Sequence, residues 1–478
     1  MTTSRHTTNA TTRRTRALAI LTLLTLLAVA CGARVSDEEV RSAGGATRTP
    51  SGQGSGAGGD EVTGGGTGAE GPTGTGASGE TGGPETEGAT PAAPAGGNGG
   101  ATDVGVTENT VLLGNVSTLS GPVPGLFQGA VIGSQAAVAY QNSKGGLFGR
   151  KFKLEVRDDQ FDTGQNRNQT IDLINKTFAF VGSFSIYDSA AVEQIGKSGI
   201  PDVTYSLSAD RRALANNFSI EPSPRSGAPT GPFNYFKKKY PDQVTAVGTI
   251  FSDITKGSHE DYKAAAESVG WKYLYERGVQ ATETDFTADV VRMRQAGVKA
   301  VFLVAVDVKT VARLAKAMAQ QNFKPEFFLV NGPAYDPSLV SLAGDSVEGL
   351  FSSQPYSLFG GEDAGVIPEV KLFNEWVQKI KPGYKPDLFA AFAWSSGRLL
   401  FQAMEAAGAK AKRTDVIAAL KKIDDFSANG LLAPAGPASK RPPDCFLLAQ
   451  LKSGKWSRVD TPAPGYRCGD GPYMVRQR

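Results

Sequence analysis

Short apolar runs alternate with segments of helical length over most of the chain after residue 104. The first run spans residues 111–116, and a second one ends at Arg157-Asp158-Asp159. Further runs of strand length lie at residues 178–182, 201–205, 244–251, 271–276, 299–306, 326–331 and 348–352. No two-residue hairpin turn joins them, so the pattern predicts an α/β fold of parallel strands and crossover helices. In such a sheet, the loops at the carboxyl ends of the strands form a ligand crevice.

The region from about residue 104 to residue 478 is too long for one ordinary hydrophobic core and fits two lobes. The Pro222-Ser223-Pro224 stretch interrupts regular structure before the apolar run at residues 244–251. We therefore expect the chain to cross near Pro222 from a first α/β lobe into a second one.

The N-terminus has the pattern of an export signal. Four arginines precede an apolar stretch at residues 17–30, which is shorter than the roughly 20 residues of a membrane-spanning helix. The stretch ends in Leu27-Ala28-Val29-Ala30-Cys31-Gly32, which is similar to the lipobox of bacterial lipoproteins and implies that Cys31 is acylated. Residues 1–31 are then a lipoprotein signal peptide. An ordinary secretory signal is the alternative, and Arg13-Arg14 leaves twin-arginine export open.

A low-complexity segment follows the signal. Residues 42–102 are nearly all Gly, Thr, Ser, Ala, Pro and Glu, with almost no large apolar side chain to bury. Such a composition favours disorder, so we expect residues 32–103 to form a tether. The glycines are not a phosphate-binding loop, because no Gly-Lys-Ser/Thr follows them.

Composition argues against several classes of function. The formal net charge of +3 includes the arginine-rich signal, and no basic block with interleaved aromatics indicates a nucleic-acid surface. The chain has two histidines, so a Ser-His-Asp site in the folded part would depend on His259. The pairs Asp158-Asp159 and Asp424-Asp425 are sequence neighbours, which on a strand point to opposite faces. We expect no enzymatic activity, with a hydrolase as a remote alternative, and no cofactor or metal.

Two cysteines remain after Cys31. Cys445 and Cys468 flank a predicted hairpin of residues 446–450 and 455–459, and an even pair in an exported protein usually forms a disulfide. Metal binding is the alternative, but no companion histidines accompany the cysteines. The expected role of the disulfide is to hold the C-terminal tail.

The run Val111-Leu112-Leu113-Gly114-Asn115-Val116, the turn Ser117-Thr118-Leu119-Ser120-Gly121-Pro122 and the segment Lys144-Gly145-Gly146-Leu147-Phe148-Gly149-Arg150 carry a family resemblance. Together they resemble the N-terminal lobe of the branched-chain amino-acid (Leu/Ile/Val)-binding proteins, the type I periplasmic solute receptors of ABC importers. The resemblance implies two Rossmann-like lobes with parallel sheets, joined by a three-segment hinge near Pro222, Leu350 and Gly430. Lobe 1 would comprise residues 104–222 plus 350–429, and lobe 2 residues 223–349 plus 430–478.

The resemblance also implies where lobe 1 binds its ligand. In the family, the loop after the fourth strand offers a backbone carbonyl and a hydroxyl to the ligand, and Ser206 and Ser208 occupy those positions here. The preceding loop resembles the family's carboxylate-binding serine loop, although a strict alignment places Ile186 where the serine is expected. Other candidates from this lobe are Ser117, Ser120, Ser183, Ser185 and Tyr187. Helix capping or ordinary packing remains the alternative for each of them.

Lobe 2 departs from the family pattern. Lys256 stands where the amino-acid binders carry a tyrosine, in a loop with Asp253, and no carboxylate follows Asn331 where the family places one. Tyr335 is a further candidate in that loop, and Asp336 is the nearest acidic substitute. A buried ammonium without a carboxylate partner costs several kcal/mol, so a plain amino acid is not implied. Lys256 would favour an anion, unless it is merely a solvated loop residue.

These features predict a solute-binding protein outside the cytoplasm, anchored by lipid to the outer face of the bacterial cell membrane. It would capture a small amino-acid-like or organic-acid ligand between its lobes and deliver it to the permease and ATPase subunits of an ABC importer. The solute stays open among amino acids, amides and small organic acids. A ligand-sensing receptor of the same fold is the alternative, since the architecture serves both roles.

Overall fold

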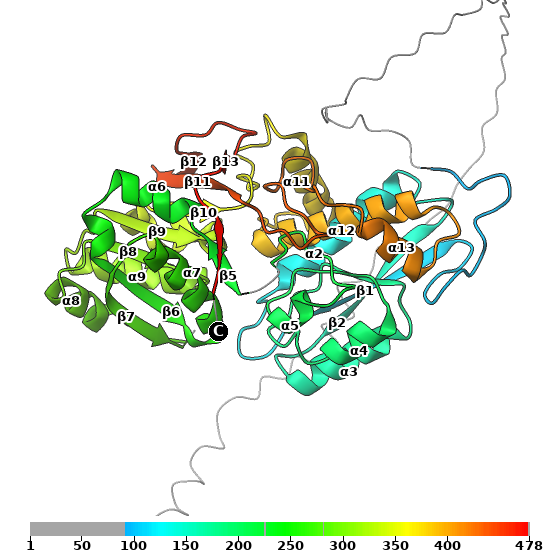
Figure 1. The fold of residues 1–478 in the computed structure, drawn as a ribbon, viewed down its shortest axis with the longest axis horizontal. Coiled ribbons are helices and arrows are strands. Elements are labelled where there is room, and N and C mark those ends of the chain that lie inside the picture. Colours follow the sequence, from blue (N-terminus) through cyan, green and yellow to red (C-terminus); the bar gives the residue numbers. More distant parts are fainter. Residues whose placement is uncertain (1–90, 224–225, 281, 477–478) are drawn as a thin grey trace, which may run out of the picture. The chain divides into compact units, whose positions relative to one another are not determined.

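A computed structural model describes residues 91–478, except for 224–225, 281 and 477–478. Cys31, the signal and most of the expected tether lie outside the described residues. In the described part, α-helices pack on two separate sheets of mainly parallel strands (Figure 1). The predicted α/β architecture is therefore confirmed. No helix among the described residues combines the length and the apolar character that crossing a membrane requires.

The first sheet has the strand order β2-β1-β3-β4, and all its strand pairs are parallel. Its strands are β1 (Thr110–Ser117), β2 (Lys151–Asp158), β3 (Ala179–Val181) and β4 (Asp202–Val203). The helices of this lobe are α2 (Gln128–Ser143), α3 (Thr163–Ile174), α4 (Val192–Ser198), α5 (Ala209–Arg212), α11 (Pro368–Ile380), α12 (Leu388–Ala407) and α13 (Arg413–Leu420). Helices α2 and α12 lie against one another on one face of the sheet, and α3 and α4 cover the other face.

The second sheet has the order β12-β11-β10-β9-β8-β6-β7. Its strands are β6 (Val247–Ser252), β7 (Tyr273–Val279), β8 (Ala300–Leu303), β9 (Phe327–Asn331), β10 (Phe351–Gln354), β11 (Cys445–Lys452) and β12 (Lys455–Arg458). Helices α6 (Gly231–Lys239) and α7 (Lys256–Ser268) pack on one face, and α8 (Thr287–Gln295), α9 (Val308–Gln320) and α10 (Leu339–Ala343) pack on the other. Short 3₁₀ turns are η1 (Gln243–Thr245), η2 (Asp253–Thr255), η3 (Gly332–Ala334) and η4 (Gly344–Val347).

Side chains of the central strands point alternately to the two faces of the second sheet, which explains why both faces are covered. Phe302 and Leu329 belong to the core on the α6–α7 side, whereas Val301 and Val330 belong to the core on the α8–α9 side. All four side chains are buried. Strands that are apolar on both faces can be stable only between two helical layers, as parallel sheets require.

Three segments connect the lobes. The first follows α5 and leads to β5 (Gly227–Pro229), the second joins β10 to α11, and the third joins α13 to β11. We expected lobe 1 to resume at residue 350, but β10 pairs in parallel with β9 and antiparallel with β11. The second crossing therefore comes after Gln354, because the backbone hydrogen bonds of β10 are made in the second sheet.

The C-terminal tail folds back on the second lobe. The hairpin of β11 and β12 leads to β13 (Arg467–Cys468), where Cys468 forms a disulfide with Cys445. Further on, β14 (Tyr473–Val475) pairs antiparallel with β5, close to the first crossing.

The last part of the expected tether packs on the first lobe. The Arg150 guanidinium donates to the carbonyl oxygens of Asn98 and Gly100, both at 2.7 Å. Asn98 is buried and donates to the carbonyl oxygens of Glu108 and Phe148. The buried guanidinium needs these backbone acceptors, so the residues that supply them belong to the folded part. The folded part therefore begins before residue 103.

Candidate solute-binding site

Ser117 and Ser183 hold together two loops at the carboxyl end of the first sheet. Ser117 Oγ donates to Asn115 Oδ1 at 2.7 Å and accepts from the backbone N–H of Phe184 at 3.1 Å. Ser183 Oγ accepts from the backbone N–H of Val116 at 3.1 Å. Both serines are buried, so the structure gives them partners within the protein.

Ser120 and Ser185 bind the neighbouring aspartates at the end of β2. Ser120 Oγ donates to Asp158 Oδ2 at 2.5 Å, and Ser185 Oγ donates to the Asp159 carboxylate. Ser185 Oγ also accepts from the backbone N–H of Tyr187 at 3.0 Å. The Tyr187 ring lies edge-on against Phe161, with 5.6 Å between ring centroids.

Ser206 and Ser208 lie where the sequence places them, in the loop after β4. Ser208 is the N-cap of α5, and its Oγ accepts from the backbone N–H of Arg211 at 3.3 Å. The carbonyl oxygen of Ser206 accepts from Arg212 Nη1 at 3.1 Å, and that of Leu207 accepts from the same nitrogen at 2.7 Å. The carbonyl expected to face a ligand's ammonium is therefore already bonded to a guanidinium.

The candidates from lobe 2 are dispersed. Lys256 is exposed at the start of α7, with its Nζ 3.9 Å from Glu260, and Asp253 accepts from Gln280 at 2.6 Å. Tyr335 is buried and donates to Glu362 at 2.7 Å. Asn331 is the one predicted site residue that lines the main cavity of the described chain.

His259, the histidine considered for a hydrolase, is buried in α7. Its ring stacks on Phe251 with 4.2 Å between centroids, and its Nε2 lies 3.0 Å from Glu276 Oε1. Burial lowers the pKa of His259, although Glu276 opposes this effect. These contacts are those of a packed structural histidine.

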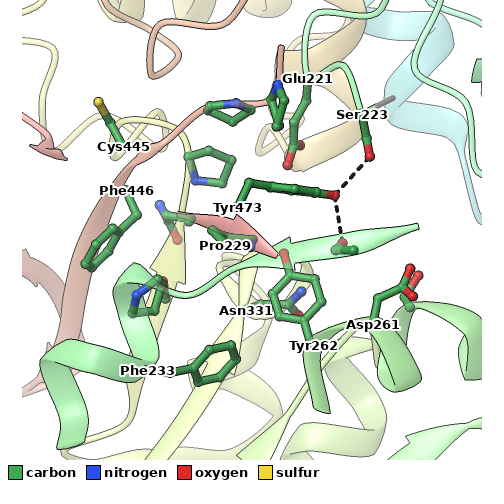
Figure 2. Close-up of a pocket in the computed structure, with 18 of the residues that line it drawn as sticks. Glu221, Ser223, Pro229, Phe233, Asp261, Tyr262, Asn331, Cys445, Phe446 and Tyr473 are labelled. Atoms are coloured by element: carbon green, nitrogen blue, oxygen red, sulfur yellow. Dashed lines mark hydrogen bonds between the residues drawn. The ribbon is translucent and has the colours of Figure 1, made fainter. Parts of the chain in front are cut away.

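A cavity of about 120 Å³ lies beside the three crossings (Figure 2). The first lobe contributes Tyr205 and Arg212 to its wall, and the second lobe contributes α7, β8 and β9. Each crossing contributes proline to its wall, namely Pro222, Pro355, and the pair Pro442 and Pro443. A water needs only about 10–15 Å³ by this measure, so the cavity has room for a small organic molecule.

Two opposite charges face this cavity without pairing. Glu221, from the first crossing, makes no side-chain hydrogen bond or ion pair with another described residue. Burial raises the pKa of Glu221 to about 7, although the Arg212 charge opposes the rise. Arg212 Nε is buried and has no hydrogen-bond partner within the described chain.

Tyrosine hydroxyls surround Glu221. Figure 2 shows Glu221 and Tyr262 pointing into the same space from opposite sides. Tyr473, from the tail, donates to the Gly227 carbonyl oxygen at 2.7 Å and lies 2.9 Å from Ser223 Oγ. Burial raises the pKa of Tyr473 to about 12 and raises the pKa of Tyr262 well above its ordinary value. Both phenols are therefore protonated at neutral pH.

Part of the cavity wall is apolar. Phe233, Phe302, Leu329 and Phe446 line it, and all four side chains are buried. The Phe233 and Phe302 rings meet edge-on, with 5.4 Å between centroids. The cavity thus offers both polar and apolar surface to a ligand.

The sequence model of the periplasmic binding protein family matches residues 110–455. The chain belongs to this family. Leu/Ile/Val-binding protein homolog 2 of Brucella abortus (strain 2308) is 26% identical over 322 residues, 66% of this chain and 83% of the relative. Leu/Ile/Val-binding protein homolog 1 of the same strain is 26% identical over 330 residues, with the same coverage. These relatives are named as solute-binding proteins, which fits the expectation of a non-enzyme.

Solved structures share the fold. The fatty acid ABC transporter substrate-binding protein from Thermomonospora curvata has a TM-score of 0.64 at 20% identity, and the match covers 77% of this chain and 95% of that one. A branched-chain amino acid ABC transporter structure from Thermus thermophilus with bound valine has a TM-score of 0.63 at 17% identity, covering 76% and 97%. The predicted type I periplasmic binding protein fold is therefore confirmed.

Arg212 and Glu221 line the cavity, and the sequence analysis missed both of them. Neither lies in a loop directly after a strand: Arg212 ends the short helix α5, and Glu221 precedes the proline-rich crossing. The available signal was the position of Glu221 next to Pro222-Ser223-Pro224, because a carboxylate at a predicted crossing lies close to both lobes.

Proposed function

We propose that the protein is a solute-binding lipoprotein outside the cytoplasm that captures a small amino-acid-like or organic-acid solute and delivers it to an ABC importer. The observation that supports this function is the cavity beside the crossings, whose wall contains residues from both lobes. Its relatives support the same class, since they are named for binding leucine, isoleucine and valine, and one structural neighbour is named for fatty acids.

In the proposed mechanism, a solute bonds first to one lobe and then stabilises the state in which the lobes meet. A ligand shifts this equilibrium only by the difference between its affinities for the open and closed states. Three connecting segments suit a hinge-bending motion, in which a few residues between rigid lobes absorb the rotation. The closed form would then dock on the permease.

Analysis of co-purified solute tests capture directly. We expect mass spectrometry of the denatured full-length protein to detect a small metabolite that is absent from a blank purification. Returning that metabolite at 100 times its Kd should stabilise the protein by about 2.7 kcal/mol, and X-ray scattering should show a smaller radius of gyration. If no metabolite is recovered, and none from a panel of amino acids, amides and organic acids changes melting or scattering, capture is wrong.

A measurement of solute uptake distinguishes delivery to an importer from a role as a ligand-sensing receptor. Cells that lack this protein should lose high-affinity uptake of the recovered solute, and the unaltered gene should restore it. Unchanged uptake combined with a lost transcriptional response to the solute would instead support a receptor.

A further inference from the structure

We infer that the solute is a small monocarboxylate with an apolar body, whose carboxylate is bound in the cavity by Arg212, Tyr205 and Tyr262. This inference rests on the proposed function and names the solute class of the same cavity. Such a ligand differs from an amino acid in one group, because it lacks the ammonium beside the carboxylate.

Arg212 gives the first argument. Its Nη1 donates to the carbonyl oxygens of Ser206 and Leu207, at 3.1 and 2.7 Å, which fixes the guanidinium at the edge of the cavity. These bonds use one lone pair of each carbonyl oxygen, and they place a positive charge beside the acceptors that an ammonium would need. Arg212 Nε, which is buried and unpartnered within the described chain, is a donor without an acceptor. An unsatisfied buried donor is costly, and a ligand carboxylate would satisfy it.

The tyrosines give the second argument. Tyr205 Oη makes no hydrogen bond with another described residue, and burial raises the pKa of Tyr205, so the hydroxyl keeps its proton. Burial also raises the pKa of Tyr262, while the Asn331 side chain acts on its hydroxyl in the opposite direction. The Tyr262 hydroxyl therefore keeps its proton and can donate it to a ligand acceptor. A carboxylate only accepts hydrogen bonds, whereas an ammonium only donates them.

Glu221 decides the pH at which such a ligand binds. The titratable and charged groups around it are Arg212 on α5, Tyr205 after β4, Asp261 and Tyr262 on α7, Tyr356 after β10, and Tyr473 on β14. Asp261 is paired with Arg476. Below pH 7 the Glu221 carboxyl is mostly neutral and donates a hydrogen bond. Above pH 7 it is ionised and repels a ligand carboxylate, so binding should weaken.

The apolar part of the wall limits the rest of the ligand. Phe233, Phe302 and Leu329 present carbon surface in the wall of the cavity, and none of them carries a charge. The cavity of about 120 Å³ has room for a short branched or cyclic hydrocarbon body.

Three compounds with one carbon skeleton isolate the head group. The full-length protein, freed of bound solute, is titrated calorimetrically at pH 6 with 4-methylpentanoate, leucine and 4-methylpentanamide. We expect 4-methylpentanoate to bind at least tenfold more tightly than the other two, because leucine adds an ammonium and the amide loses the charge. Tighter binding of leucine or the amide overturns the inference, and so does the absence of binding by all three.

Substitutions of cavity residues test whether the ligand carboxylate binds in the cavity. Arg212→Met should weaken 4-methylpentanoate binding tenfold or more, whereas Arg167→Met, at an exposed position on α3, should leave it unchanged. Tyr262→Phe removes one hydroxyl from a side chain of the same shape, and a several-fold loss is expected even if Arg212→Met does not fold. Unchanged affinity in Tyr262→Phe and in folded Arg212→Met contradicts the assignment.

The pH dependence of ligand affinity tests the role of Glu221. Binding to the unaltered protein should weaken by up to tenfold per pH unit above pH 7. Glu221→Gln should bind at pH 6 and lose this dependence, while the exposed control Glu193→Gln should keep it. A Glu221→Gln variant that loses binding at pH 6 and a parent that prefers leucine would together identify Glu221 as an ammonium partner, against the inference.

The outcomes also separate this inference from the proposed function. If a solute without a carboxylate is recovered and closes the lobes, capture stands and the carboxylate assignment fails. If no solute is recovered and none from the panel binds, both fail.

Discussion

Arg211 and Arg212 are neighbours in α5, yet their environments differ. Arg211 is buried and binds Asp202 through two hydrogen bonds, Nε to Oδ2 at 2.9 Å and Nη2 to Oδ1 at 2.8 Å. Arg212 faces the cavity and keeps a donor without a partner in the described chain. Breaking a buried ion pair typically costs about 3–5 kcal/mol, so Arg211 serves the fold, whereas the unsatisfied Arg212 is available to a ligand.

The stability of the ligand-free protein should report the charge state of Glu221. Burial raises its pKa from 4.5 to about 7, so the folded protein holds this proton more tightly than the unfolded chain does. The resulting stabilisation is fully present below pH 4.5 and is lost as the pH rises to 7. Glu221→Gln should therefore gain stability relative to the parent between pH 4 and pH 8, by up to about 3 kcal/mol, as measured by urea unfolding.

Glu193→Gln is the control for this measurement, because the shift of Glu193 has the opposite sign. A hydrogen bond from Lys197 lowers the pKa of this exposed carboxyl, so its small contribution is present at high pH and is lost as the pH falls. An equal effect of Glu221→Gln at pH 4 and pH 8 would mean that the Glu221 carboxyl is not perturbed.

Residue roles were harder to predict than residue positions. The sequence placed the loop serines at the carboxyl ends of strands, and the structure puts them there. The Ser117 hydroxyl bonds to Asn115 of its own strand. The Ser120 and Ser185 hydroxyls bond to Asp158 and Asp159 at the end of β2, which no local pattern reveals, because these partners are distant in sequence. Whether the serines also bind the solute stays a prediction.

At the scale of elements, the strands were predictable because their side chains are buried on both faces of the sheet. Every apolar run from residues 244–251 to 326–331 overlaps a strand of the second sheet. Strand ends were less predictable: β4 covers only Asp202–Val203 within the expected residues 201–205. Beside β4, the Asn217 side chain donates a hydrogen bond to the Ser206 side chain. After Val203, side-chain contacts of this kind replace the backbone hydrogen bonds between strands. The hairpin of β11 and β12 was predicted because its turn residues separate two alternating runs.

The disulfide should stabilise the tail and, through it, one wall of the cavity. Cys445 and Cys468 are 23 residues apart, and Cys445 itself lines the cavity. On the chain-entropy model, a loop of this size contributes about 3 kcal/mol. Cys445→Ser combined with Cys468→Ser should lower the free energy of unfolding by about this amount, as measured by denaturant titration.

A reducing agent provides the control for the disulfide. It should destabilise the parent to a similar extent and should leave the double variant unchanged. A parent whose unfolding does not respond to complete reduction would show that the hydrogen bonds of β14 and β5, rather than the disulfide, hold the tail.

For the whole molecule, the expected anchor is separate from the folded part. Within the described residues, Asn98 is already buried against the first lobe. Removing the anchor should therefore leave the fold and the cavity intact. A single acyl chain gives only marginal membrane binding, whereas two or more chains hold a protein stably. Because Cys31 is the residue expected to carry the lipid, anchoring should depend on Cys31.

Cys31→Ser should consequently move the protein from the membrane fraction to the soluble fraction when it is expressed in its own host, without changing its melting temperature. Detergent phase partitioning measures the transfer, because an acylated protein enters the detergent phase and an unmodified one does not. The variant with both Cys445 and Cys468 replaced should stay with the membrane, which excludes a general effect of losing cysteines. If mass spectrometry shows that Cys31 of the membrane-bound parent carries no acyl group, the lipobox interpretation is wrong.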